Sequence, residues 1–219
     1  MKNPCAYCGA TAVDRTRGHV FSKNLYPKSL SDVKRILVPE CLNCKARWED
    51  ADPHFRNVVL AAWHPEKHPE DSRYEKMRRS FSHCDGTRRL RDLTQCMREF
   101  QIEGKVRRKI YPMEDLKFVL VLKRIIRGLC HHHDLGTAIP DTRVTCDVLR
   151  YMIPEGIERE MDWNVIADSF IRYSYLEWVN EEASSTWILE IGTQMQFIAW
   201  IHSSPNKTIQ ADAFGAANF

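Results

Sequence analysis

The chain has 219 residues, of which 43% are hydrophobic and 28% are charged, and its formal net charge at pH 7 is +3. No stretch approaches the roughly 20 apolar residues of a transmembrane helix, and the N-terminal residues MKNPCAYCGATA lack the apolar run of a signal peptide. The sequence therefore predicts a cytoplasmic protein without a membrane segment, built as one large domain or two small ones.

Charge is distributed unevenly along the chain. Residues 1–110 hold 23 Lys/Arg against 14 Asp/Glu, whereas residues 111–219 hold 9 against 15. Basic residues in this density suit the phosphate backbone of a nucleic acid. A solvated helical face is the other interpretation of such charge runs, and the sequence leaves both open.

Two Cys-x-x-Cys pairs, Cys5/Cys8 and Cys41/Cys44, stand near the N-terminus with 32 residues between them. Two such pairs can complete a tetrahedral zinc site. Disulfides are the alternative, but they need an oxidising compartment. We therefore predict structural zinc, which would supply much of the stability of this polar region. The other cysteines lack ligand spacing and are expected to be buried free thiols: Cys84, Cys96, Cys130 and Cys146.

The elements expected between residues 33 and 111 are short. The longest is a helix that begins just after Cys44, presents one apolar face and runs through Trp63. His64-Pro65 ends it, because the residue before a proline disfavours helical geometry. The others are a strand over 33–38 that leads into a turn at 39–41, basic helices over 72–82 and 87–96, and a hairpin over 97–102 and 105–111.

The second half of the chain carries the stronger patterns. Pro112 leads into the strongest helix, whose broad apolar stripe ends near His133. Alternating segments at 170–179, 186–191 and 194–201 predict an antiparallel meander. The predicted fold class is α+β, with a small zinc-stapled module over residues 1–64 and a mixed helical and antiparallel-sheet domain over residues 65–219.

His19 lies between the two cysteine pairs. On a hairpin fixed by zinc it would face the start of the following helix, with room between them for a divalent cation and a scissile phosphate. A neutral imidazole near pH 7 suits the activation of water, and a bound cation would stabilise the developing charge. Without the cysteine context, the same residue would be a surface or capping histidine.

Four motifs resemble the zinc-containing type of HNH endonuclease, over roughly residues 5–60. The resemblance implies a ββα-metal fold with His19 as the general base at the end of the first strand. It also implies a catalytic divalent cation, Mg²⁺ or Mn²⁺ with Ni²⁺ or Zn²⁺ as alternatives, and DNA, double-stranded, as the substrate. A weaker resemblance to longer bacterial members lies at 127–132. The four motifs are Cys5-x-x-Cys8-Gly9, Gly18-His19-Val20-Phe21-Ser22-Lys23, Val38-Pro39-Glu40-Cys41-x-x-Cys44, and Trp48 through His54-Phe55-Arg56.

The sequence departs from the family pattern at two positions of the catalytic metal site. The family usually has Asp or Glu before its histidine, where this chain has Gly18, and Asn or His after the last cysteine, where it has Lys45. Three interpretations stay open. Lys45 replaces part of the metal's charge, or the module binds DNA without cleaving it, or the cation uses other ligands, namely Asp50, Asp52 and His54.

Each of these residues also has a structural interpretation. Asp50 and Asp52 suit the first turns of a helix, and His54 suits packing against the module. Arg56 could bind phosphate or pair with Asp52. The run at 131–133 suits a helix C-terminus better than a metal site. The residues expected to contact nucleic acid are Arg17, Lys23, Lys45, Arg47 and Arg56.

The sequence thus predicts a metal-dependent endonuclease that hydrolyses the phosphodiester bonds of DNA with His19 as base. The first alternative is a catalytically degenerate zinc-binding relative that binds nucleic acid or a protein partner without cleaving. The second is a structural zinc domain that binds a protein partner, or a second copy of the chain, through the acidic C-terminal half.

Overall fold

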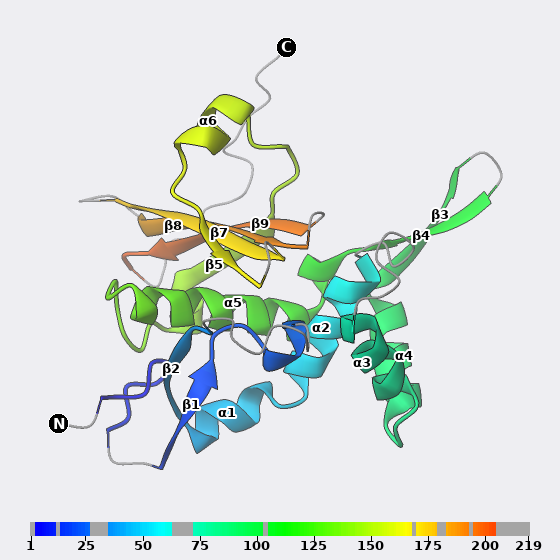
Figure 1. Ribbon diagram of the computed structural model, residues 1–219, viewed down its shortest axis with the longest axis horizontal. Helices are drawn as coiled ribbons and strands as arrows, with labels where there is room; N and C mark the ends of the chain where they lie inside the picture. Colours follow the sequence, from blue (N-terminus) through cyan, green and yellow to red (C-terminus); the bar gives the residue numbers. More distant parts are fainter. Residues whose placement is uncertain are drawn as a thin grey trace.

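A computed structural model describes residues 3–11, 14–26, 35–62, 72–102, 105–167, 170–178, 183–192 and 195–204. The fold is α+β, as predicted, with helices and antiparallel sheets (Figure 1). None of the described helices is long and apolar enough to cross a membrane. The helices are α1 (Leu42–Trp48), α2 (Ala51–Ala62), α3 (Ser72–Phe81), α4 (Gly86–Gln95), α5 (Leu116–His132) and α6 (Glu155–Glu160). The strands are β1 (Arg15–His19), β2 (Leu37–Cys41), β3 (Met97–Ile102), β4 (Lys105–Ile110), β5 (Val144–Val148), β6 (Asn164–Ile166), β7 (Ile171–Glu177), β8 (Ala183–Ile191) and β9 (Met195–His202).

The N-terminal unit is a hairpin followed by helices. Strands β1 and β2 pair antiparallel, with Arg15 opposite Cys41 and His19 opposite Leu37. Helix α1 begins directly after Cys41, because the Cys41 thiol accepts the N–H of Cys44 and caps the helix. The order β1–β2–α1 is the ββα arrangement that the resemblance implies.

The single helix predicted after Cys44 is instead two helices, α1 and α2. Pro53 accounts for the break, because a proline ring clashes with the carbonyl four residues before it, here that of Glu49. The predicted end at 64–65 lies outside the described residues. Strand β2 also extends through the turn expected at 39–41, since its pairing with β1 continues to Cys41.

Helix α5 runs between the N-terminal hairpin and the five-stranded sheet (Figure 1). The Asp115 side chain caps its N-terminus by accepting the N–H of Phe118 at 2.9 Å. The ring of Phe118 stacks on Phe55 of α2 at 4.4 Å between centroids, and it contacts Phe197 of β9 at 5.6 Å. The apolar stripe predicted for this helix therefore packs against both layers.

The large sheet has the order β5-β9-β8-β7-β6, and all its pairs are antiparallel. The predicted meander is confirmed as β7, β8 and β9 at its centre. The edge strands β5 and β6 were not predicted, because segments of five and three residues carry too little alternation. The predicted basic helices and small hairpin are also present, as α3, α4 and β3–β4 (Figure 1).

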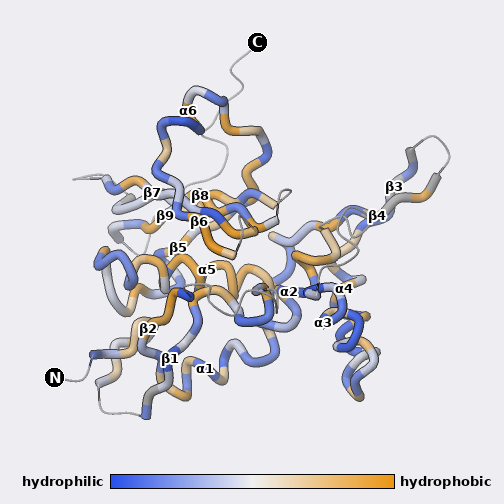
Figure 2. The backbone as a smooth tube through the Cα atoms, in the orientation of Figure 1, coloured by the Kyte–Doolittle hydropathy of each residue, from blue (hydrophilic) through white to orange (hydrophobic). Residues whose placement is uncertain are grey.

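The buried apolar side chains form one cluster that extends from the cysteines through α2 and α5 to the sheet. Figure 2 shows mainly hydrophobic residues along α5 and mainly hydrophilic residues along α3 and α4. The N-terminal unit therefore shares its core with the rest of the chain. The division into residues 1–64 and 65–219 stays a prediction.

Candidate functional site

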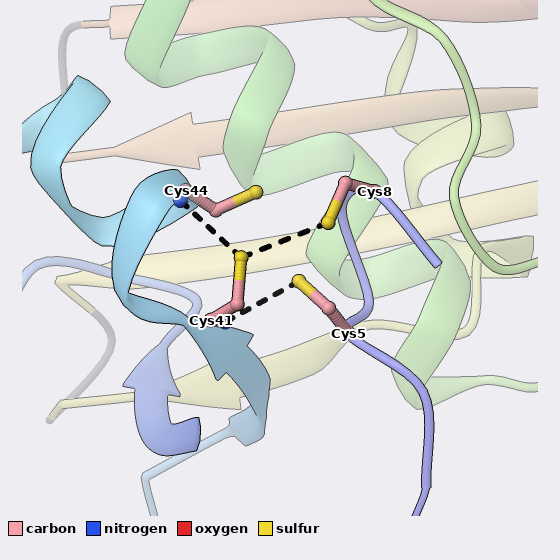
Figure 3. Close-up of side chains that lie close together, drawn as sticks. All are labelled: Cys5, Cys8, Cys41 and Cys44. Atoms are coloured by element: carbon pink, nitrogen blue, oxygen red, sulfur yellow. Dashed lines mark hydrogen bonds between the residues drawn. The ribbon is translucent and has the colours of Figure 1, made fainter. Parts of the chain in front are cut away.

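The four predicted cysteines gather where β2 meets α1 (Figure 3). All four thiols are free, so the disulfide alternative is not formed, and the sulfur atoms lie within 4.8 Å of one another. Cys8 Sγ and Cys41 Sγ are 3.7 Å apart. Tetrahedral zinc with bonds of about 2.3 Å imposes a separation of about 3.8 Å. The cluster is therefore close enough to bind one metal ion, and its geometry fits zinc.

Backbone N–H groups point at these sulfur atoms. The N–H of Cys41 donates to Cys5 Sγ, and that of Cys44 donates to Cys41 Sγ, each at 3.4 Å. Burial acts to raise the pKa of Cys5, but the N–H groups around it outweigh burial and lower this pKa to about 7. Burial and the neighbouring thiols raise the pKa of Cys44. Burial and the neighbouring thiols thus oppose the deprotonation of Cys44. A bound cation would favour deprotonation, since thiolates are the metal-binding form.

The first cysteine turn is tied to two other parts of the chain. Ala6 donates its N–H to the carbonyl of Pro39 at 2.8 Å, and Ala138 donates to the carbonyl of Ala6 at 2.9 Å. Gly9 closes the turn with φ of +74°, a left-handed conformation that favours glycine. The cluster is thus held by β2 and by the loop after α5.

His19 lies half-buried at the end of β1. Its Nδ1 is buried and has no hydrogen-bond partner among the described residues. Burial, followed by the positive charges of Arg35, Lys23 and Arg124, lowers the pKa of His19 below its ordinary 6.5. The imidazole is therefore neutral at pH 7 and can accept a proton.

Glu40 occupies the space beside Gly18. A Cβ added at Gly18 would lie 2.6 Å from Glu40 Oε2, and Glu40 Oε1 accepts a hydrogen bond from Trp48 Nε1 at 2.8 Å. Burial raises the pKa of Glu40. A carboxyl group therefore does lie against position 18, but it comes from β2 and is already held by Trp48.

Arg124 of α5 is buried behind His19. Its Nη1 donates to Asp52 Oδ2 at 2.9 Å, and its Nη2 donates to the carbonyls of His19 and Val20, each at 3.3 Å. Only 4% of the Arg124 side chain is exposed, against 25% for Asp52. One guanidinium therefore fixes the backbone at His19 and the orientation of Asp52.

The three residues predicted as ligands of a catalytic cation do not converge. Asp50 lies in the turn before α2, and Asp52 and His54, two apart on α2, point in different directions. No described group of three potential ligands includes Asp50 or Asp52. Their nearest partners are Arg88 at 2.9 Å for Asp50, Arg124 at 2.9 Å for Asp52 and Asp115 at 2.5 Å for His54.

Four of the five residues predicted to contact nucleic acid are exposed: Arg17, Lys23, Lys45 and Arg47. Arg47 also pairs with Asp141 at 3.0 Å and lies over the Trp48 ring at 4.9 Å. These side chains are accessible to a phosphate.

Arg56 differs from the other four, because only 5% of it is exposed. Its Nη2 donates to Asn57 Oδ1 at 2.7 Å, and burial lowers its pKa to about 10. Helix α2 packs against α5 as well as α3 and α4, so residues 54–60 are all buried. Arg56 is therefore unavailable to a phosphate, and Asp52 pairs with Arg124 instead.

The structure adds residues that sequence reasoning missed. Arg127 donates to the carbonyl of Tyr7 and to Asp141, so it ties α5 to the first cysteine turn. A Cβ at Gly128 would lie 2.9 Å from Val20 Cγ2, so glycine permits this close approach. The sequence signal that could have identified these residues is the presence of two arginines, Arg124 and Arg127, inside an otherwise apolar stripe.

The three histidines at 131–133 do not converge on one point. His131 is hydrogen-bonded to Thr137, and His133 is hydrogen-bonded to Tyr173.

No protein-family model matches this chain, and neither a curated protein nor a solved structure matches it. The likeness to HNH endonucleases therefore rests on the cysteine and histidine motifs together with the β1–β2–α1 order.

Proposed function

We propose that this protein is a zinc-stapled endonuclease of the HNH type, in which His19 is the general base for hydrolysis of a phosphodiester bond in DNA. The observation that carries the proposal is the position of His19. It ends the first strand of a ββα unit, and its lowered pKa leaves it neutral at pH 7. The exposed basic side chains of the same unit support DNA as the substrate.

Zinc in the cysteine cluster has a structural role in this proposal. Cys5, Cys8, Cys41 and Cys44 would hold the ion, and four thiolates would leave no position for water. Bound there, zinc would join the first cysteine turn to β2 and α1, and so would fix the hairpin that carries His19.

The chemistry assigned to this chain is proton transfer and charge stabilisation. His19 accepts a proton from the water that attacks phosphorus. Lys23 and Arg35, whose charges act on His19, stabilise the negative charge that develops on the phosphate. Arg124 is a positioning residue, because it holds the backbone at His19. Asp50, Asp52 and His54 do not converge on one point, so no step is assigned to a catalytic cation.

The proposal is tested by nicking of supercoiled plasmid, with Mg²⁺, Mn²⁺, Ni²⁺, Zn²⁺ or EDTA. We expect His19→Ala to lower the rate by a factor of about 10²–10⁴, the usual contribution of a general base. The wild-type rate should rise with pH through a value below 6.5, because the pKa of His19 is lowered. His132→Ala, at an exposed histidine outside the site, is the matched control and should nick at the wild-type rate.

A second candidate is a protein that binds DNA without cleaving it. The observation in its favour is Gly18, which offers no ligand where the family carries an acid, while the neighbouring carboxyl group of Glu40 accepts a hydrogen bond from Trp48. This candidate predicts DNA binding that weakens steeply with salt, with no nicking by wild type in any of the four metals. Nicking that His19→Ala does not alter would exclude the endonuclease proposal as stated.

A further inference from the structure

A second group of metal-ligating side chains lies where α2, α4 and α5 meet. His54 comes from α2, Cys96 is the C-cap of α4 and Asp115 is the N-cap of α5. His54 and Cys96 are buried and Asp115 is partly buried, and their ligand atoms lie within 4.8 Å of one another. Three elements separated in sequence therefore direct a nitrogen, a sulfur and an oxygen atom to one point.

The separations suit a tetrahedral ion. Cys96 Sγ lies 3.7 Å from His54 Nε2, and zinc with bonds of about 2.0 and 2.3 Å imposes roughly 3.5 Å. Asp115 Oδ2 lies 2.5 Å from His54 Nε2 and 2.6 Å from Cys96 Sγ. A shift of this oxygen by about 1 Å makes room for the ion. The other oxygen, Oδ1, is held by the N–H of Phe118, which orients the carboxylate.

The same three residue types could form a nucleophilic Cys–His–Asp relay, but the geometry excludes it. In such a relay the acid holds one ring nitrogen while the other nitrogen takes the proton of the nucleophile. Here Asp115 contacts His54 Nε2, the same nitrogen that faces Cys96. His54 Nδ1 has no partner among the described residues. All three groups thus converge on one point instead of forming a chain.

The convergence point opens onto a cavity of about 330 Å³. The three candidate ligands line this cavity together with Asp92 and Gln95, among others. A site with three protein ligands and access to a cavity resembles zinc sites that keep one position for water or an external ligand. The cysteine cluster differs, because its four thiols leave no such position.

We propose that His54, Cys96 and Asp115 bind one divalent cation of the zinc class, with the fourth ligand position facing the cavity. A mixed set of imidazole, thiolate and carboxylate suits borderline ions such as Zn²⁺ and Co²⁺ and disfavours Mg²⁺ or Ca²⁺. The ion would tie α4 to α2 and α5. His19 is not among the ligands, so this metal site and the proposed nuclease activity are independent of each other and are tested separately.

The test measures metal content after untagged, reduced protein is loaded with Zn²⁺ and freed of loosely bound ions. Wild type should hold about one zinc ion per chain more than Cys96→Ser, which keeps a hydrogen bond to Asp115 but is a poor zinc ligand. Asp115→Asn should lose the same ion, and its amide oxygen still caps α5. Circular dichroism of each variant verifies the fold. With Co²⁺, the wild-type minus Cys96→Ser difference spectrum should show a sulfur-to-cobalt charge-transfer band.

Cys84→Ser is the matched control. His83, Cys84 and Asp85 also lie within 4.8 Å of one another, but they are consecutive and exposed. This variant should keep the wild-type zinc content. Equal content in wild type, Cys96→Ser and Asp115→Asn would overturn the proposal, and so would loss of the extra ion in Cys84→Ser alone.

Discussion

Gly18 is the residue of the β1–β2 hairpin at which packing leaves no space for a side chain. A Cβ there would meet Glu40 Oε2 at 2.6 Å and Glu40 Cβ at 2.8 Å, inside contact distance. The position at which HNH enzymes carry an acid is therefore closed to any side chain while Glu40 lies over it. Since Glu40 also accepts from Trp48, the carboxyl group cannot turn away without loss of a buried hydrogen bond.

We expect Gly18→Ala to destabilise the protein by about 1–3 kcal/mol, the usual cost of overpacking. The free energy of unfolding in denaturant measures the effect. Gly156→Ala is the control, because its Cβ would meet no atom within 4 Å and it lies in α6. Gly156 is the second residue of α6, where alanine is accommodated without a clash, so the control should not be destabilised. Equal shifts in the two variants would contradict the close contact with Glu40.

At the scale of elements, helix α5 connects the N-terminal hairpin to the sheet. Its apolar stripe was predictable from the spacing of its hydrophobic residues, and its N-cap follows from Asp115. The role of Arg124 and Arg127 was not predictable in the same way. Apart from Asp141, which is near Arg127 in sequence, their partners are Asp52, Tyr7 and the carbonyls at 19–20, which lie about 70 to 120 residues away.

We expect Arg124→Met to destabilise the protein by about 3–5 kcal/mol, because it leaves Asp52 and two carbonyls without their buried partner. Denaturant unfolding measures this cost. In the double variant with Asp52→Asn, the cost should be less than the sum of the two single costs, because the charge left unpaired has been removed. Strict additivity would show that the Arg124–Asp52 contact contributes nothing.

At the scale of the whole molecule, one apolar cluster joins the cysteine region to the sheet. Phe21 of the N-terminal unit lies 6.2 Å from Tyr173 of β7 between ring centroids. A fold with a shared core should unfold in one transition, whereas two independent domains divided at residue 64 should give two.

We therefore expect far-UV circular dichroism and tryptophan fluorescence to report the same thermal midpoint. A chelator that removes the metal from the cysteine cluster should lower that midpoint for both probes together, because loss of the ion removes folding free energy. A midpoint that falls for only one probe, or two separate transitions, would show instead that the N-terminal unit folds alone.

The sequence by itself determined the features that depend on local spacing. The two Cys-x-x-Cys turns, the apolar stripe of α5 and the alternation of β7, β8 and β9 are each set within a few residues. Pro53 also indicates the break between α1 and α2. The apolar periodicity nevertheless predicted a single helix, because it continues on both sides of Pro53.

Only the tertiary structure decided which side chains meet. It buried Arg56, separated Asp50, Asp52 and His54, laid Glu40 over Gly18 and brought Cys96 to His54 and Asp115. None of these contacts follows from spacing, because each depends on how whole helices or strands pack against one another. Helix packing is set by the fit of many side chains at once, so the partners of a single polar residue appear only when all the elements are in position.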